Sequence, residues 1–149
     1  MPHISMVTLG VDDLARATAF YEACGWRRSP ASVPGVVSFL HGSTAALGLF
    51  GRDALAADAG VPALAGAATP SAISLAMNLS DPDAVDDAVA VAARAGAVIT
   101  APAQPTDWGG YAGSFQDLDG HLWEVAHNPF FPLRDDGGVA LPTDDAIGG

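Results

Sequence analysis

The sequence predicts an α+β fold made of two modules with the same order: a strand, a helix and then about three strands. The first block covers residues 4–50, and the block that starts at residue 71 repeats its order. The junction between strand and helix also recurs, because LGVDD at 9–13 aligns with MNLSD at 77–81, an offset of 68 residues. The match lies in the pattern more than in the identities, and it indicates a duplicated βαβββ module.

The first module begins with a strand at residues 4–11, where apolar and polar side chains alternate. Asp12 or Asp13 then caps a helix, because its carboxylate accepts hydrogen bonds from the free amides of the first turn. Gly25 is a natural end for that helix. The remaining strands of this module are expected at 26–29, 36–41 and 45–50.

The second module starts with alternation over residues 73–79, which again predicts a strand. Ser80 or Asp81 caps the following helix, and Pro82 suits its first turn because proline needs no amide donor there. Gly96 ends the helix. Further strands are expected at 98–100, 113–116 and 122–126, with Pro102 and Pro105 breaking the first of them.

The last two strands form a hairpin whose turn is Asp117-Leu118-Asp119-Gly120. The Asp-Gly pair predicts a primed turn, since both residues tolerate the positive φ that such a turn needs. Alternation in the second arm puts Glu124 on the face opposite Trp123 and Val125. Burying an ionised carboxylate is costly unless it is paired, hydrogen-bonded or bound to a metal, so Glu124 either faces solvent or lies in a functional cleft.

This hairpin resembles the closing hairpin of the vicinal oxygen chelate superfamily, the group of glyoxalases, bleomycin-resistance proteins and extradiol dioxygenases. The resemblance extends over residues 3–133. It implies that the two modules form a curved mixed sheet around a central cleft. The residues that carry it are Phe115, Asp117, Asp119-Gly120, Trp123-Glu124-Val125 and Asn128-Pro129.

The chain is therefore expected to form a single domain over residues 1–131, with modules at 3–51 and 71–131. The linker at 52–70 is rich in Ala and Gly, with one helical turn expected at 53–59. A plain connector and a lid both remain open for it. Residues 132–149 are acidic and Gly-rich, which favours a loosely held tail.

In metal-dependent members of the superfamily, four strand positions supply the ligands. The resemblance places these positions at Met6, Gly48, Ser74 and Glu124. Only Glu124 is a strong ligand, whereas a usual site needs three or four N or O donors. We therefore expect no metal and no other cofactor; a site built from His41 and Glu124 is the one weak alternative.

The cleft implied by the resemblance is lined mostly by apolar groups, which is typical of a small-molecule pocket. A filled core is the alternative interpretation of the same apolar residues. In a desolvated cleft, Glu124 could act as a general base or accept a hydrogen bond from a ligand. The expected lining consists of Met6, Thr8, Phe50, Ser74, Asn78, Trp108, Tyr111, Phe115, Leu122 and Glu124.

The predicted function is the binding of a small organic molecule, as in bleomycin-resistance proteins, by a homodimer. The alternative is a metal-dependent lyase, isomerase or dioxygenase of the glyoxalase type with an atypical metal site. A scaffold or regulatory module without a ligand is a third possibility. The absence of His or Glu at Met6, Gly48 and Ser74 favours binding over the metal-dependent reactions.

Composition excludes several classes of partner. The net charge is −11, with six arginines and no lysine, so the surface is unsuited to nucleic acid or anionic membranes. No apolar run approaches the roughly 20 residues of a membrane helix, and the N-terminus lacks the pattern of a signal peptide. The expected location is the cytoplasm. The one cysteine, Cys24, has no partner for an intrachain disulfide.

Overall fold

The computed structural model describes residues 2–63 and 73–143 and confirms the α+β fold with two βαβββ modules. The first module contains β1 (Met6–Val11), α1 (Leu14–Ala23), β2 (Arg27–Arg28), β3 (Val37–His41) and β4 (Ala46–Gly51). The second contains β5 (Ser74–Asn78), α3 (Pro82–Ala95), β6 (Val98–Pro105), β7 (Tyr111–Gln116) and β8 (Leu122–His127). Between them lies α2 (Arg52–Ala59), longer than the single turn expected there. No helix in these two ranges is long and apolar enough to cross a membrane.

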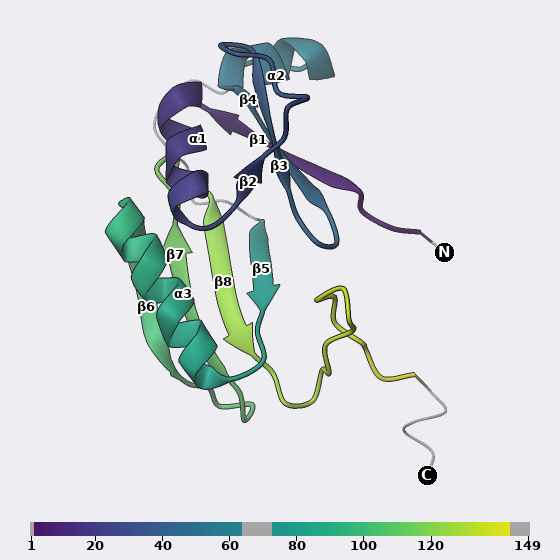
Figure 1. The fold of residues 1–149 in the computed structure, drawn as a ribbon, viewed down its shortest axis with the longest axis vertical. Helices are drawn as coiled ribbons and strands as arrows, with labels where there is room; N and C mark the ends of the chain where they lie inside the picture. The colour runs from purple at the N-terminus through teal and green to yellow at the C-terminus, as the bar shows by residue number, and fades with distance from the viewer. Residues whose placement is uncertain (1, 64–72, 144–149) are drawn as a thin grey trace.

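Each module has its own four-stranded sheet, in the orders β1-β4-β3-β2 and β5-β8-β7-β6. The first strand of each module runs parallel to the last, and the other pairs are antiparallel. Helices α1 and α3 each pack on one face of a sheet and touch one another (Figure 1). Among the described helices, α2 packs on the opposite face of the first sheet, against Gly10 at the end of β1; a Cβ there would lie 3.3 Å from Leu55 Cδ2.

The helix starts agree with the sequence prediction. Asp13 accepts a hydrogen bond of 2.9 Å from the Arg16 amide, and Asp81 accepts one of 2.8 Å from the Ala84 amide. The Ala84 hydrogen bond is the main reason that the pKa of Asp81 lies below its usual range. These caps satisfy amides that have no partner within the helix.

Two local predictions need correction. Strand β6 continues through Pro102 to Pro105, because prolines are tolerated on an edge strand. Pro102 also lies within a register shift between Ala101 and Gln104. The hairpin turn is also not a primed turn of two positive-φ residues. Gly120 alone in it has positive φ, at 85°, and Asp119 keeps a negative φ.

The segment after the second module is more ordered than the predicted loose tail. A backbone bridge joins Leu133 to Val139, and the Arg134 amide donates to the Gly138 carbonyl at 2.7 Å. This hairpin, residues 132–140, is called the tail hairpin below. Linker residues 64–70 and tail residues 144–149 lie outside the described part of the chain.

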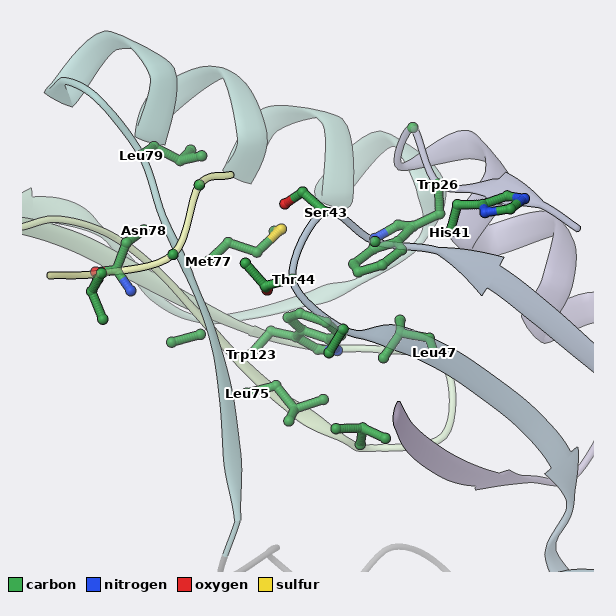
Figure 2. Close-up of a pocket in the computed structure, with 18 of the residues that line it drawn as sticks. Trp26, His41, Ser43, Thr44, Leu47, Leu75, Met77, Asn78, Leu79 and Trp123 are labelled. Atoms are coloured by element: carbon green, nitrogen blue, oxygen red, sulfur yellow. The ribbon is translucent and has the colours of Figure 1, made fainter. Parts of the chain in front are cut away.

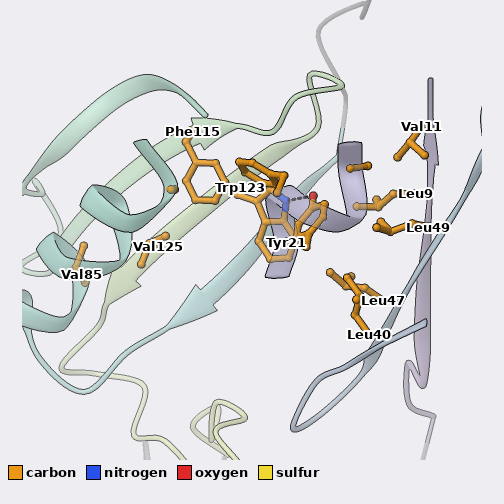
Figure 3. Packing of buried hydrophobic residues seen from close by; sticks show 13 residues of the cluster. Leu9, Val11, Tyr21, Leu40, Leu47, Leu49, Val85, Phe115, Trp123 and Val125 are labelled. Carbon is orange, nitrogen blue, oxygen red and sulfur yellow. Dashed lines mark hydrogen bonds between the residues drawn. The ribbon is translucent and has the colours of Figure 1, made fainter. Parts of the chain in front are cut away.

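One apolar core runs through both modules (Figure 3). Leu9, Val11 and Leu49 belong to its first-module side, and Val85 and Val125 to its second. Tyr21 and Trp123 lie between the two sides. The core of the duplicated chain is therefore shared, and neither module buries its helix alone.

The hairpin turn of the second module carries a buried carboxylate that joins the modules. Asp117 is 4% exposed, and its Oδ2 accepts a hydrogen bond of 2.5 Å from the Tyr21 hydroxyl. Its Oδ1 accepts from the amides of Asp119 and His121, at 2.9 and 2.8 Å. The Tyr21 oxygen in turn accepts from Trp123 Nε1 at 3.1 Å. A buried charge is tolerated where several donors satisfy it, as here.

Two further contacts join the same turn to the end of β1. The Asp12 amide donates to Asp119 Oδ1 at 2.9 Å, and His121 Nε2 donates to the Gly10 carbonyl at 2.8 Å. We call residues 117–121 the locking turn, because side chains on it bind the first module at three places.

Replacing Tyr21 with phenylalanine should lower the free energy of unfolding by about 1–3 kcal/mol, because Asp117 Oδ2 and the Trp123 N–H lose a buried partner. Chemical denaturation at pH 7 measures this. Tyr111→Phe is the matched control, since the Tyr111 hydroxyl bonds Asp86 in an exposed pair. An equal loss in both variants would contradict the special role of Tyr21.

The loss of unfolding free energy in Tyr21→Phe should also depend on pH. Burial first, and then the charge of Asp117, raises the pKa of Tyr21. The unfolded tyrosine loses its proton near pH 10, so the stabilisation is complete below about pH 10 and falls as the pH rises. The gap between wild type and Tyr21→Phe should therefore narrow above about pH 10, by up to about 1.4 kcal/mol per pH unit.

Candidate functional site

The sequence-predicted site residues divide between the open faces of two different sheets. Met6, Thr8 and Phe50 lie on the first sheet, on the face away from α1. Ser74, Leu122 and Glu124 lie on the second sheet, on the face away from α3. Glu124 is exposed, so it lacks the desolvation that a general base in a cleft would need.

Three predicted aromatic residues do not share the face of Glu124. Phe115 is 3% exposed and stacks on Trp123 on the helix side of the second sheet, with ring planes 9° apart. Tyr111 also lies on that side, where its hydroxyl donates to Asp86 Oδ1 at 2.7 Å. Trp108 is in the loop before β7 and is 46% exposed.

The four family metal positions do not provide a set of donors for a divalent cation. A Cβ at Gly48 would lie 3.0 Å from Thr8 Oγ1 and 3.6 Å from Met6 Sδ, so these two side chains close over the position. Glu124 is flanked on its sheet by Ala76 and Ser114. Among residues 2–63 and 73–143, no three His, Cys, Asp or Glu side chains are grouped to hold a metal. These residues do not fit the metal of the family.

The two modules and the tail hairpin instead border an open pocket of about 700 Å³ (Figure 2). Its walls are largely apolar. Trp26 and Leu47 line it from the first module, and Leu75, Met77 and Trp123 from the second. We call this cavity the outer pocket.

Several polar residues also line the outer pocket and form what we call its rim. His41, Ser43 and Thr44 come from the β3–β4 hairpin, and Asn78 from the end of β5. The tail hairpin forms another part of the rim, through Arg134 and residues 137–139. It also reaches the β3–β4 loop, because a Cβ at Gly137 would be 3.3 Å from Ser43 Oγ.

Sequence reasoning missed most of the outer pocket. Of the residues predicted to bind a ligand, Asn78 lines it. Trp123, Leu75 and Met77 alternate with the predicted residues along β8 and β5, so they belong to the faces that the pattern assigned to the core. Two tryptophans in different modules, Trp26 and Trp123, were the signal that could have indicated it. His41 is among the lining residues and Glu124 is not, so the structure brings no His41–Glu124 site together.

Cys24, at the end of α1, lines the outer pocket as well. Burial raises the pKa of its thiol to about 11. The thiol is therefore protonated near neutral pH and is a weak nucleophile.

Comparison with known proteins identifies the fold. A family model described as Glyoxalase/Bleomycin resistance protein/Dioxygenase superfamily matches residues 3–125. A solved glyoxalase-related enzyme from Fulvimarina pelagi is similar with a TM-score of 0.83 and 30% identity, over 96% of this chain and 100% of that one. A glyoxalase/bleomycin resistance protein/dioxygenase from Nocardioides is similar with a TM-score of 0.72 and 26% identity, over 85% of this chain and 83% of that one. Among curated proteins, none matches.

After dialysis against Ni²⁺, Mn²⁺, Fe²⁺ or Zn²⁺, the untagged protein should retain far less than one metal ion per chain. The reason is that Glu124 is the single strong donor at the four family positions. Elemental mass spectrometry measures the content, with Glu124→Ala as the control. About one metal per chain, lost in Glu124→Ala, would overturn this assignment.

Proposed function

Because the chain belongs to the Glyoxalase/Bleomycin resistance protein/Dioxygenase superfamily, we propose that it binds a small organic molecule in the outer pocket, without a metal. The observation that carries the proposal is the cavity of about 700 Å³ with an apolar wall and a polar rim. Small-molecule sites have volumes of roughly 300–1,000 Å³ and combine apolar walls with a few polar groups.

The arrangement of the wall favours a ligand with a planar part. Trp26 and Trp123 come from different modules, and their ring centroids are 6.0 Å apart in an edge-to-face arrangement. Both rings line the outer pocket, so a flat apolar group can bury against either of them. The hydroxyls of Ser43 and Thr44 and the amide of Asn78 can then orient the polar part of the ligand at the rim.

The proposal is one of binding and not of metal-dependent catalysis. The family positions supply one carboxylate, and it is exposed on the far face of the second sheet. The Cys24 thiol in the pocket is held in its protonated form. The pocket therefore presents surfaces that recognise a molecule rather than groups that would react with it.

The proposal includes a homodimer that pairs through the exposed edge of the first sheet. Among the described strands, β1 pairs with β4 alone and β5 with β8 alone, so each sheet ends in an edge. Beside the first edge, Ile4 is 71% exposed and Met6 44% exposed. Exposed edges with apolar side chains favour pairing with another chain.

Met6→Glu should shift the protein from dimer to monomer, because it places a charge in the proposed interface. Sedimentation velocity over a range of concentrations measures the change. Ala90→Glu is the matched control, since Ala90 is exposed on α3, which packs on the helix side of the second sheet. A wild-type protein that sediments as a monomer at high concentration would remove the dimer from the proposal.

Trp26→Ala should weaken binding of 8-anilinonaphthalene-1-sulfonate at least tenfold, since it removes an indole from the pocket wall. Fluorescence titration of this planar aromatic probe measures the affinity. Trp108→Ala is the matched control, because Trp108 lies outside the outer pocket and was a sequence-predicted ligand residue. Melting curves verify that both variants fold. Equal affinities, or a loss in Trp108→Ala alone, would place the site elsewhere.

A further inference from the structure

A second, smaller cavity of about 140 Å³ lies next to the outer pocket, between α1, α3 and the second sheet. We call it the inner chamber. The two cavities share Trp26, Met77 and Trp123 among their walls. Figure 2 shows these three side chains directed into the same space. Side-chain motion at this partition, above all of the flexible Met77, would connect the two cavities.

The inner chamber owes its space to small side chains on α3. Ala88 and Ala92 face it one turn apart, with Val91 beside them. Rings from the other elements close it, among them Phe20 of α1 and Phe115 of β7. Alanine at two neighbouring positions of a helix face leaves a gap that a larger apolar residue would fill.

The inner chamber presents almost no free polar group. The Tyr21 hydroxyl is bonded to Asp117, and the Trp123 N–H is bonded to the Tyr21 oxygen. Cys24, which also lines the chamber, has a protonated thiol, a weak donor. An apolar cavity of this kind stays dry, and an engineered one of about 150 Å³ in another protein binds benzene.

We propose that the inner chamber holds a compact apolar group of the ligand, about the size of one aromatic ring, while the rest of the ligand lies in the outer pocket. This inference rests on the proposed function of the outer pocket. It narrows the ligand class to amphipathic molecules that end in a phenyl-sized or compact branched aliphatic group. The polar part would then lie toward Ser43, Thr44 and Asn78 at the rim.

Fluorobenzene is the probe for the inner chamber, because it is small enough to enter and ¹⁹F NMR reports its binding directly. We expect saturable binding to wild type that benzene displaces. Ala88→Leu should weaken this binding at least tenfold by filling the chamber. Ala90→Leu is the matched control, because Ala90 is exposed on the same helix.

Binding of 8-anilinonaphthalene-1-sulfonate separates the two proposals, since this probe is too large for a cavity of about 140 Å³ and reports the outer pocket. In Ala88→Leu this probe should still bind, because its naphthalene ring can stay in the outer pocket when the inner chamber is filled. Equal fluorobenzene binding in Ala88→Leu and Ala90→Leu would overturn the inner chamber as a site and leave the outer pocket intact. If 8-anilinonaphthalene-1-sulfonate does not bind to wild type, that result would instead overturn the proposed function.

A second variant decides the matter if Ala88→Leu does not fold. Met77→Ala removes part of the partition and should admit 1-fluoronaphthalene, which wild type binds at least tenfold more weakly. An unchanged affinity for 1-fluoronaphthalene in Met77→Ala would contradict the connection between the cavities and with it the proposal.

Discussion

The structure depends on one buried carboxylate. Asp117 lies in a turn of the second module, yet one of its three hydrogen bonds comes from Tyr21 on the helix of the first. A charge in that position is tolerable only while all its donors are in place. The hydrogen bonds therefore fix the distance between the modules, and the apolar core can then fill the space around Tyr21 and Trp123.

That constraint also decides where a ligand can bind. With α1 against α3, the open faces of the two sheets belong to separate surfaces, and the space between the modules opens on the side of the tryptophans. The position that the family uses for a metal ligand on the second sheet, Glu124, then faces solvent. The same βαβββ frame thus has a pocket between its modules, while the family metal positions of this chain supply one strong donor, Glu124.

The duplicated pattern predicted the two modules, both helix caps and the opposite facing of Glu124 and Trp123, because these follow from periodicity and from local hydrogen bonding. The outer pocket could not be predicted from this pattern, because it depends on how the two modules pack against each other. Trp26 and Trp123 are far apart in sequence, and each alone is typical of a core residue. The length of β6 was missed for a related reason, since proline breaks a strand in the middle of a sheet but not at its edge.

The β3–β4 and β7–β8 hairpins occupy equivalent places in the two modules but differ in what their turns contact. In the second module, the β7–β8 turn carries two buried aspartates and holds the halves together. In the first, the β3–β4 loop at 42–45 has no acidic residue and borders the outer pocket instead. The internal pseudosymmetry of the fold is thus broken by a few side chains in its turns. One copy of the duplicated loop stabilises the fold, so the other copy is free of that constraint and can shape the mouth of the outer pocket.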